Sequence, residues 1–126
     1  MAEKPIVAVA GASGDLGFRI AVALAERGAD VVALVRPNLA SDEVVRLKGV
    51  GLTLREADPY DPKSLAKTCE GATCVISALN GLRDAVIDRQ SLLLDAAVDA
   101  GVPRFIPSDF SEDFTKTEQG KTVISI

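Results

Sequence analysis

Apolar runs alternate with amphipathic stretches along the chain. Five short runs are rich in Val, Ala, Leu and Ile, which is typical of strands buried on both faces of a parallel sheet. These runs cover residues 5–10, 30–35, 52–56, 73–79 and 104–108. The four stretches between them carry apolar residues at helical spacing and end near a glycine. These stretches cover residues 14–27, 41–48, 61–70 and 84–100.

This strict alternation predicts a parallel α/β sheet with helices on both faces. The connections are short, and parallel neighbours require right-handed crossovers. We therefore expect a Rossmann-type, doubly wound sheet of about five strands in the order 3-2-1-4-5. One domain is expected over residues 1–117, followed by a divergent tail over 118–126.

Individual residues predict where helices begin and which face is buried. Ser41 is expected to cap the second helix, and Asp61, directly before Pro62, the third. The first helix is expected to bury an apolar stripe. Its members are Leu16, Ile20, Ala23 and Leu24.

Composition and charge narrow the class of partner. The chain is 48% hydrophobic and 25% charged, with a net charge of −4. The pI of about 4.8 leaves no basic face for nucleic acid or an anionic membrane surface. No apolar run approaches the length of a membrane span, so a cytoplasmic protein is expected.

The reactive residue types exclude several chemistries. With no histidine, a Ser-His-Asp relay and a His-ligated metal are both excluded, and no metal site is expected. Cys69 and Cys74 are too few for a disulfide framework or a zinc site, and we expect two buried thiols.

A glycine-rich string, GASGDLG, joins the first strand to the first helix. Gly11 would allow the tight turn, Gly14 a close approach of backbone to a pyrophosphate, and Gly17 the packing of helix on strand. The helix N-terminus at Asp15 and Leu16 would offer free N–H groups to phosphate, and the Ser13 side chain would add a hydroxyl. The alternative is a turn with spare glycines.

The residue after the second strand predicts which dinucleotide would bind. An acidic residue there holds the ribose of NAD, whereas an arginine accommodates the 2′-phosphate of NADP. Here the residue is Arg36, so NADP is expected. The alternative is a solvated arginine on a loop.

Five longer strings can be compared with known families. They are GASGDLG, VRP, ADPYDPKSL, VISALNG and AAVDAGVPRFIPSDFSEDFT. Together they resemble the NmrA-like and isoflavone-reductase-like group of atypical short-chain dehydrogenase/reductases, over residues 5–117. The resemblance implies an NADPH-dependent reductase. It also implies cofactor contacts by Asp58 near the adenine, by Ser77, Ala78, Leu79 and Pro107, and by Phe110 near the nicotinamide.

The chain also departs from that group. Members run to about twice this length and carry a substrate domain after the fifth strand, so a truncated form is expected. No catalytic residue is assigned, because Lys116 and Lys121 lie too close to the PSDF string. Tyr60 and Lys63 also lack the Tyr-x-x-x-Lys spacing. Three functions stay open: a reductase of an unknown small molecule, a non-catalytic NADP-binding redox sensor with a protein partner, and a truncated remnant.

The fifth strand would leave an open sheet edge, which invites pairing. Residues 121–126 are β-prone and are expected to form a sixth strand on this sheet or on that of a second copy. Exchange of this strand, or pairing at the edge, would give a homodimer. The alternative is a frayed tail.

Overall fold

The computed structural model describes residues 4–79 and 83–107 of the 126-residue chain, with the backbone alone at 83–85. Within these residues, strands and helices alternate strictly, as the sequence predicts. The elements are β1 (Ile6–Ala10), α1 (Asp15–Glu26), β2 (Asp30–Val35), α2 (Ser41–Gly49), β3 (Thr53–Glu56), α3 (Pro62–Cys69), β4 (Cys74–Ser77), α4 (Arg83–Asp99) and β5 (Phe105–Ile106).

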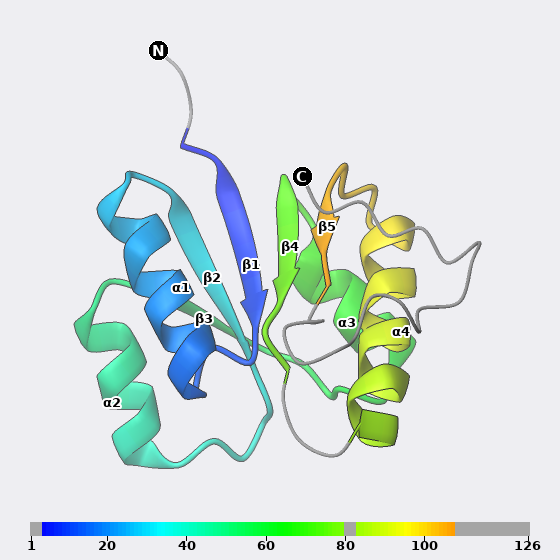
Figure 1. The fold of residues 1–126 in the computed structure, drawn as a ribbon, viewed down its shortest axis with the longest axis horizontal. Coiled ribbons are helices and arrows are strands. Elements are labelled where there is room, and N and C mark those ends of the chain that lie inside the picture. The colour runs from blue at the N-terminus through cyan, green and yellow to red at the C-terminus, as the bar shows by residue number, and fades with distance from the viewer. Residues whose placement is uncertain (1–3, 80–82, 108–126) are drawn as a thin grey trace.

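The strands form one parallel sheet in the order β3-β2-β1-β4-β5, which confirms the expected fold class (Figure 1). β1 lies at the centre, where its last residue, Ala10, pairs with Leu34 of β2 and Ser77 of β4. The carboxyl ends of these three strands therefore meet at one edge of the sheet. This is the edge at which ligands bind in open α/β sheets.

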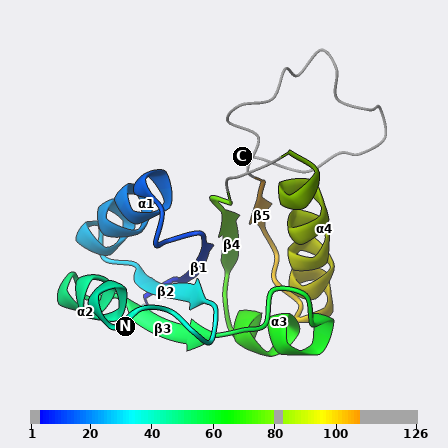
Figure 2. The ribbon, with the colours of Figure 1, turned by 90° about the horizontal axis from the view of Figure 1, so that it is seen from below.

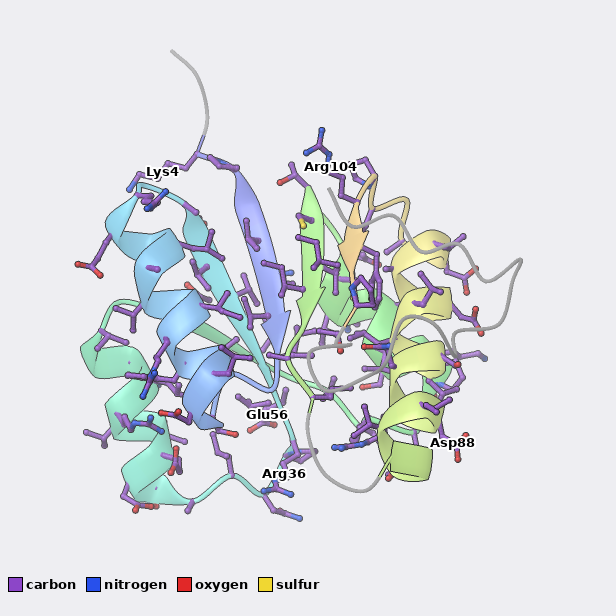
Figure 3. The ribbon with its side chains drawn as sticks, in the orientation of Figure 1. Lys4, Arg36, Glu56, Asp88 and Arg104 are labelled. Atoms are coloured by element: carbon purple, nitrogen blue, oxygen red, sulfur yellow. The ribbon has the colours of Figure 1, made fainter. Side chains whose placement is uncertain are left out.

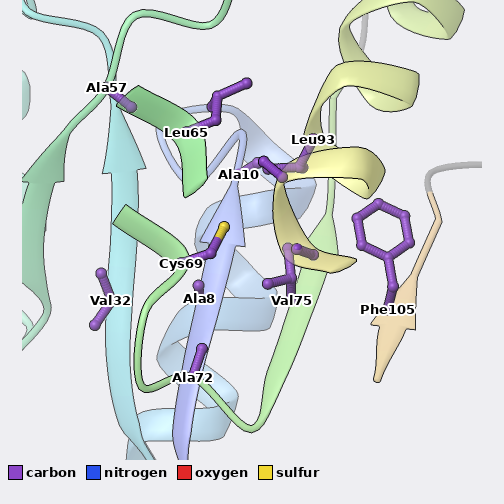
Figure 4. Packing of buried hydrophobic residues seen from close by; sticks show 12 residues of the cluster. Ala8, Ala10, Val32, Ala57, Leu65, Cys69, Ala72, Val75, Leu93 and Phe105 are labelled. Carbon is purple, nitrogen blue, oxygen red and sulfur yellow. The ribbon is translucent and has the colours of Figure 1, made fainter. Parts of the chain in front are cut away.

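Helices cover both faces of the sheet, with α1 and α2 on one face and α3 and α4 on the other (Figure 2). The side chains of β1 alternate between two cores. Val9 packs in the cluster beneath α1 and α2, together with Leu47 of α2. Ala8 packs in the cluster beneath α3 and α4, together with Leu93 of α4 (Figure 4).

Two helix details differ from the sequence prediction. Ser41 is not a cap: Ala40 holds the cap position, Ser41 is the first helical residue, and no side chain caps α2. Acidic residues of the first turn, Asp42 and Glu43, provide a favourable charge at this helix terminus instead. The prediction for Asp61 is confirmed, since its Oδ1 accepts a hydrogen bond of 3.2 Å from the Lys63 N–H.

The buried face of α1 is also rotated relative to the expected stripe. The fully buried residues are Gly17 and Ala21, whereas Leu16 is 44% exposed and Ala23 is exposed too. Ile20 and Leu24 do pack against the core, as expected. The cause is the close approach of α1 to the turn before it, which only small side chains permit.

The last strand of the sheet, β5, is shorter than the sequence predicts. β5 comprises two residues rather than the expected five, and Arg104 before it is exposed. The expected strand at 121–126 and the domain boundary near 117 lie outside the described residues. Across the part of the chain that is described, no helix is both long and apolar enough to cross a bilayer.

Candidate functional site

A cavity of about 430 Å³ opens at the carboxyl edge of the sheet. Its floor is aliphatic and is shared with the core beneath α3 and α4. Ala10, Leu65, Leu93 and Ala57 contribute to this floor, and Figure 4 shows them near the carboxyl end of β1. A concave site of this size, with polar groups placed around an apolar floor, is typical of small-molecule and cofactor sites.

The first wall is the glycine turn between β1 and α1. Gly11 has φ +83°, and a Cβ there would lie 2.5 Å from the Ala78 carbonyl oxygen. The turn closes with a 3.1 Å hydrogen bond from the Gly14 N–H to the Gly11 carbonyl. A Cβ on Gly17 would overlap that same carbonyl oxygen. The roles predicted for Gly11 and Gly17 are therefore steric requirements of this backbone.

The turn leads directly into the N-terminus of α1. Gly14 holds the cap position in an extended conformation and supplies no side chain to the helix N–H groups. Such a terminus attracts anions, through both its N–H groups and the helix dipole. Gly14 and Ser13 line the cavity. Asp15 forms an exposed ion pair of 3.3 Å with Arg19.

Arg46 of α2 holds this turn from outside the cavity. Its Nη1 donates to the Ser13 carbonyl at 3.3 Å and lies 3.1 Å from Glu43 Oε2. Its guanidinium also covers the ring of Phe18 on α1. This role was not predictable from the sequence, where only the spacing of Glu43 and Arg46 is visible.

The second wall contains the arginine predicted to select NADP. Arg36 follows β2, is exposed, and lines the cavity (Figure 3). Arg89 of α4 lines it too. Of the described lining residues these two are cationic, and none is acidic. A chain of net charge −4 therefore places positive charge around this cavity.

The third wall is the loop after β3, where Pro59 and Tyr60 line the cavity. Asp58, expected near the adenine, does not line it. Its Oδ1 accepts a 2.9 Å hydrogen bond from the Tyr60 N–H, and its own N–H donates to Ser64 Oγ at 3.1 Å. Asp58 thus shapes the loop that carries Tyr60.

The remaining predicted site residues lie in several places. Leu79 lines the cavity, whereas Ala78 is buried against the glycine turn. Ser77 is fully buried at the end of β4, and its Oγ finds no hydrogen-bond partner among the residues that the structure describes. Pro107 is buried and is not among the described lining residues, and Phe110 lies outside the described residues.

Several lining residues were not predicted as site residues. The structure adds Leu39, Pro59, Tyr60 and Arg89 to the cavity wall. Tyr60 and Arg89 are separated by 29 positions along the chain (89 − 60), and only the fold brings both to one cavity. A signal for Tyr60 did exist, because an isolated aromatic between two Asp-Pro pairs favours an exposed loop.

The two cysteines take no part in this cavity. Both are free, and burial raises the pKa of each thiol above its usual value. The hydrogen bond from Thr68 and the charge of Arg55 only partly oppose this effect at Cys69. Among the residues described, no group of three or more potential metal ligands is found.

The parallel sheet, the glycine turn and the ligand-binding edge define a Rossmann-type α/β protein. The chain belongs to the NmrA-like family, whose model matches residues 3–124. The resemblance found in the sequence motifs is thereby confirmed.

Individual relatives are reductases by name. The chain is 38% identical to an isoflavone reductase homologue of Zea mays, over 97% of this chain and 41% of the relative. It is 35% identical to a phenylcoumaran benzylic ether reductase of Nicotiana tabacum, over 93% of this chain and 39% of the relative. The chain therefore spans about two fifths of the length of these curated relatives.

Solved structures agree with this assignment. The pinoresinol reductase structure AtPrR2 with NADP+ and (+)pinoresinol matches with a TM-score of 0.76 and 34% identity, over 86% of this chain and 37% of that one. A structure from work on pinoresinol-lariciresinol and phenylcoumaran benzylic ether reductases matches with a TM-score of 0.80 and 31% identity. That match covers 94% of this chain and 40% of the other.

Proposed function

We propose that this chain binds NADP(H) in the cavity at the carboxyl edge of its sheet. We further propose that it serves as the cofactor-binding part of an NADPH-dependent reductase of a small molecule. The observation that carries the proposal is the position of Arg36, which shares one cavity with Gly11 and Gly14 of the glycine turn. Both features favour phosphate groups: a guanidinium binds phosphate oxygens with two hydrogen bonds, and the glycine backbone lets a phosphate approach the helix N-terminus closely.

Each wall of the cavity has a role in this proposal. The glycine turn and the uncapped start of α1 would hold the pyrophosphate. Arg36 would pair with the 2′-phosphate, in a geometry for which a guanidinium is well suited. The aliphatic floor formed by Ala10, Leu65 and Leu93 would keep water away from the bound nucleotide. When bound, NADPH supplies the hydride for reduction.

The substrate would be a small molecule. The relatives include an isoflavone reductase homologue, a phenylcoumaran benzylic ether reductase and a pinoresinol reductase. The shared family supports reduction as the reaction class for the whole protein. Turnover of an added enone or quinone with NADPH would support the reductase. NADPH binding without any turnover would instead support a non-catalytic, cofactor-sensing role.

Calorimetric titration of the purified chain with NADPH and NADH tests the binding proposal. A charge-assisted contact contributes about 1.5–3 kcal/mol, so NADPH should bind about 10- to 100-fold more tightly than NADH. Equal affinities would overturn the role of Arg36. Absence of binding to either nucleotide would overturn the proposed function.

A further inference from the structure

Tyr60 stands out among the residues of the cavity wall. It is the single tyrosine of the chain, which contains no tryptophan. Its side chain is 63% exposed, although it lines the cavity. Neither of the two core clusters includes this ring. An exposed aromatic ring at the wall of a cavity is suited to stacking on a flat ligand.

The loop that carries Tyr60 is held in place by side chains. The Asp58 carboxylate accepts a hydrogen bond from the Tyr60 N–H, and the Ser64 hydroxyl of α3 accepts one from the Asp58 N–H. The Asp61 N–H donates to the Asp58 carbonyl at 3.1 Å. The backbone on both sides of Tyr60 is thus held in a tight turn, which reduces the backbone entropy lost when the ring binds a ligand.

The same loop is tied to β2, whose last residue directly precedes Arg36. The Ala57 N–H donates to the Val35 carbonyl at 2.9 Å, directly before Arg36 in the sequence. Tyr60 and Arg36 therefore line one cavity from two backbone segments that are joined by a hydrogen bond. The wall near them is otherwise apolar, with Pro59 and Leu39.

We propose that Tyr60 stacks on the adenine of a bound adenosine 2′-phosphate group, whose phosphate pairs with Arg36. This inference rests on the proposed function. In it, Tyr60 makes the site prefer a phosphate that carries a base over phosphate alone. Asp58 then acts as a positioning residue for Tyr60. The chemical class recognised by this half of the cavity is a purine nucleoside phosphate.

The single tyrosine makes this inference directly measurable. With no tryptophan present, intrinsic fluorescence of the chain reports on Tyr60 alone. Adenosine 2′,5′-bisphosphate should quench this emission with a saturable dependence, and the midpoint should equal the dissociation constant measured by calorimetry. Inorganic pyrophosphate, which carries no base, should leave the emission unchanged at concentrations that saturate its own binding.

Variants of Tyr60 distinguish a loss of stacking from a loss of folding. Base–aromatic stacking predicts that Tyr60→Ala weakens binding of adenosine 2′,5′-bisphosphate about 5- to 100-fold. Tyr60→Phe keeps the ring and should stay within about twofold of the wild type. Val98→Ala changes a side chain of α4 that is 67% exposed and does not line the cavity, and it should leave binding unaltered. Because Tyr60 is mostly exposed, circular dichroism should show all three variants folded.

The outcomes distinguish a failure of the stacking role of Tyr60 from a failure of NADP(H) binding by the chain. If the wild type binds neither NADPH nor adenosine 2′,5′-bisphosphate, the proposed function fails. If the wild type binds both, but Tyr60→Ala binds equally well and no quenching occurs, only the stacking role fails. A loss of binding in Tyr60→Phe as large as that in Tyr60→Ala would also overturn stacking, because the ring is retained.

Discussion

The guanidinium carbon of Arg46 lies 3.9 Å from the centre of the Phe18 ring. This contact joins α2 to α1, and the same guanidinium donates a hydrogen bond to the Ser13 carbonyl of the glycine turn. The ion pair with Glu43 fixes the arginine from its own helix. The glycine turn is therefore supported by a side chain that is not among the described residues of the cavity lining.

Removal of Arg46 should loosen this support. Arg46→Ala is expected to lower the free energy of unfolding by about 1–2 kcal/mol, since it loses a cation–π contact and a hydrogen bond. A double-mutant cycle with Phe18→Leu should give a coupling energy of about 0.5–1 kcal/mol by chemical denaturation. Additive effects of the two substitutions would contradict a direct interaction.

Replacing glycine by alanine should change the stability differently at two helical positions. Gly17→Ala would place a methyl group against the Gly11 carbonyl and should cost about 1–3 kcal/mol of stability. Gly49→Ala, at the last residue of α2, meets no atom within 4 Å and should leave stability equal or raise it by up to about 1 kcal/mol. Thermal unfolding of both variants checks the pair. Equal effects would show that α1 does not need its close approach to the turn.

Arg55 of β3 closes the C-terminal end of α3. Its Nη1 donates to the carbonyls of Thr68 and Glu70, each at 3.0 Å. Arg55→Ala should therefore cost about 1–3 kcal/mol, because these carbonyls lose a charged donor. Arg19→Ala is the control, since its ion pair with Asp15 is exposed and should change stability by less than about 0.5 kcal/mol. Similar losses in both variants would contradict the capping role.

The two thiols should be slow to react in the folded protein. Burial raises the pKa of Cys69 and of Cys74, so the reactive thiolate is scarce near neutral pH. A thiol reagent such as DTNB should label the unfolded chain much faster than the folded one.

The same pKa shifts predict a dependence of stability on pH. The unfolded chain releases its thiol protons first as the pH rises, so the free energy of unfolding should fall above about pH 8.5. Cys74→Ala should reduce this fall. Rapid labelling of both thiols in the native state, or an unchanged pH dependence in the variant, would contradict the burial argument.

The strand order was predictable because alternation and short connections leave few topologies for a parallel sheet. The cap at Asp61 was predictable too, since Pro62 after an aspartate marks a helix start. Leu16 was misassigned because its exposure depends on how closely α1 approaches the glycine turn, which periodicity does not encode.

The candidate site was predictable where chemistry lies within one motif, as in the glycine turn and Arg36. Tyr60 and Arg89 come to the cavity from a loop and a helix whose relative position is set by packing of α3 on α4. No local pattern carries that information.

The central claim is that the glycine turn and Arg36 together form a site for NADPH. Calorimetric titration of wild type, Arg36→Ala and Arg104→Ala with NADPH and NADH tests it most directly. Arg104 is the matched control, because it is exposed at the opposite end of the sheet from Arg36 (Figure 3). We expect wild type and Arg104→Ala to prefer NADPH at least about tenfold, and Arg36→Ala to lose this preference while its affinity for NADH is unchanged. A preference for NADPH that persists in Arg36→Ala, or its absence in the wild type, would show that Arg36 does not select the cofactor.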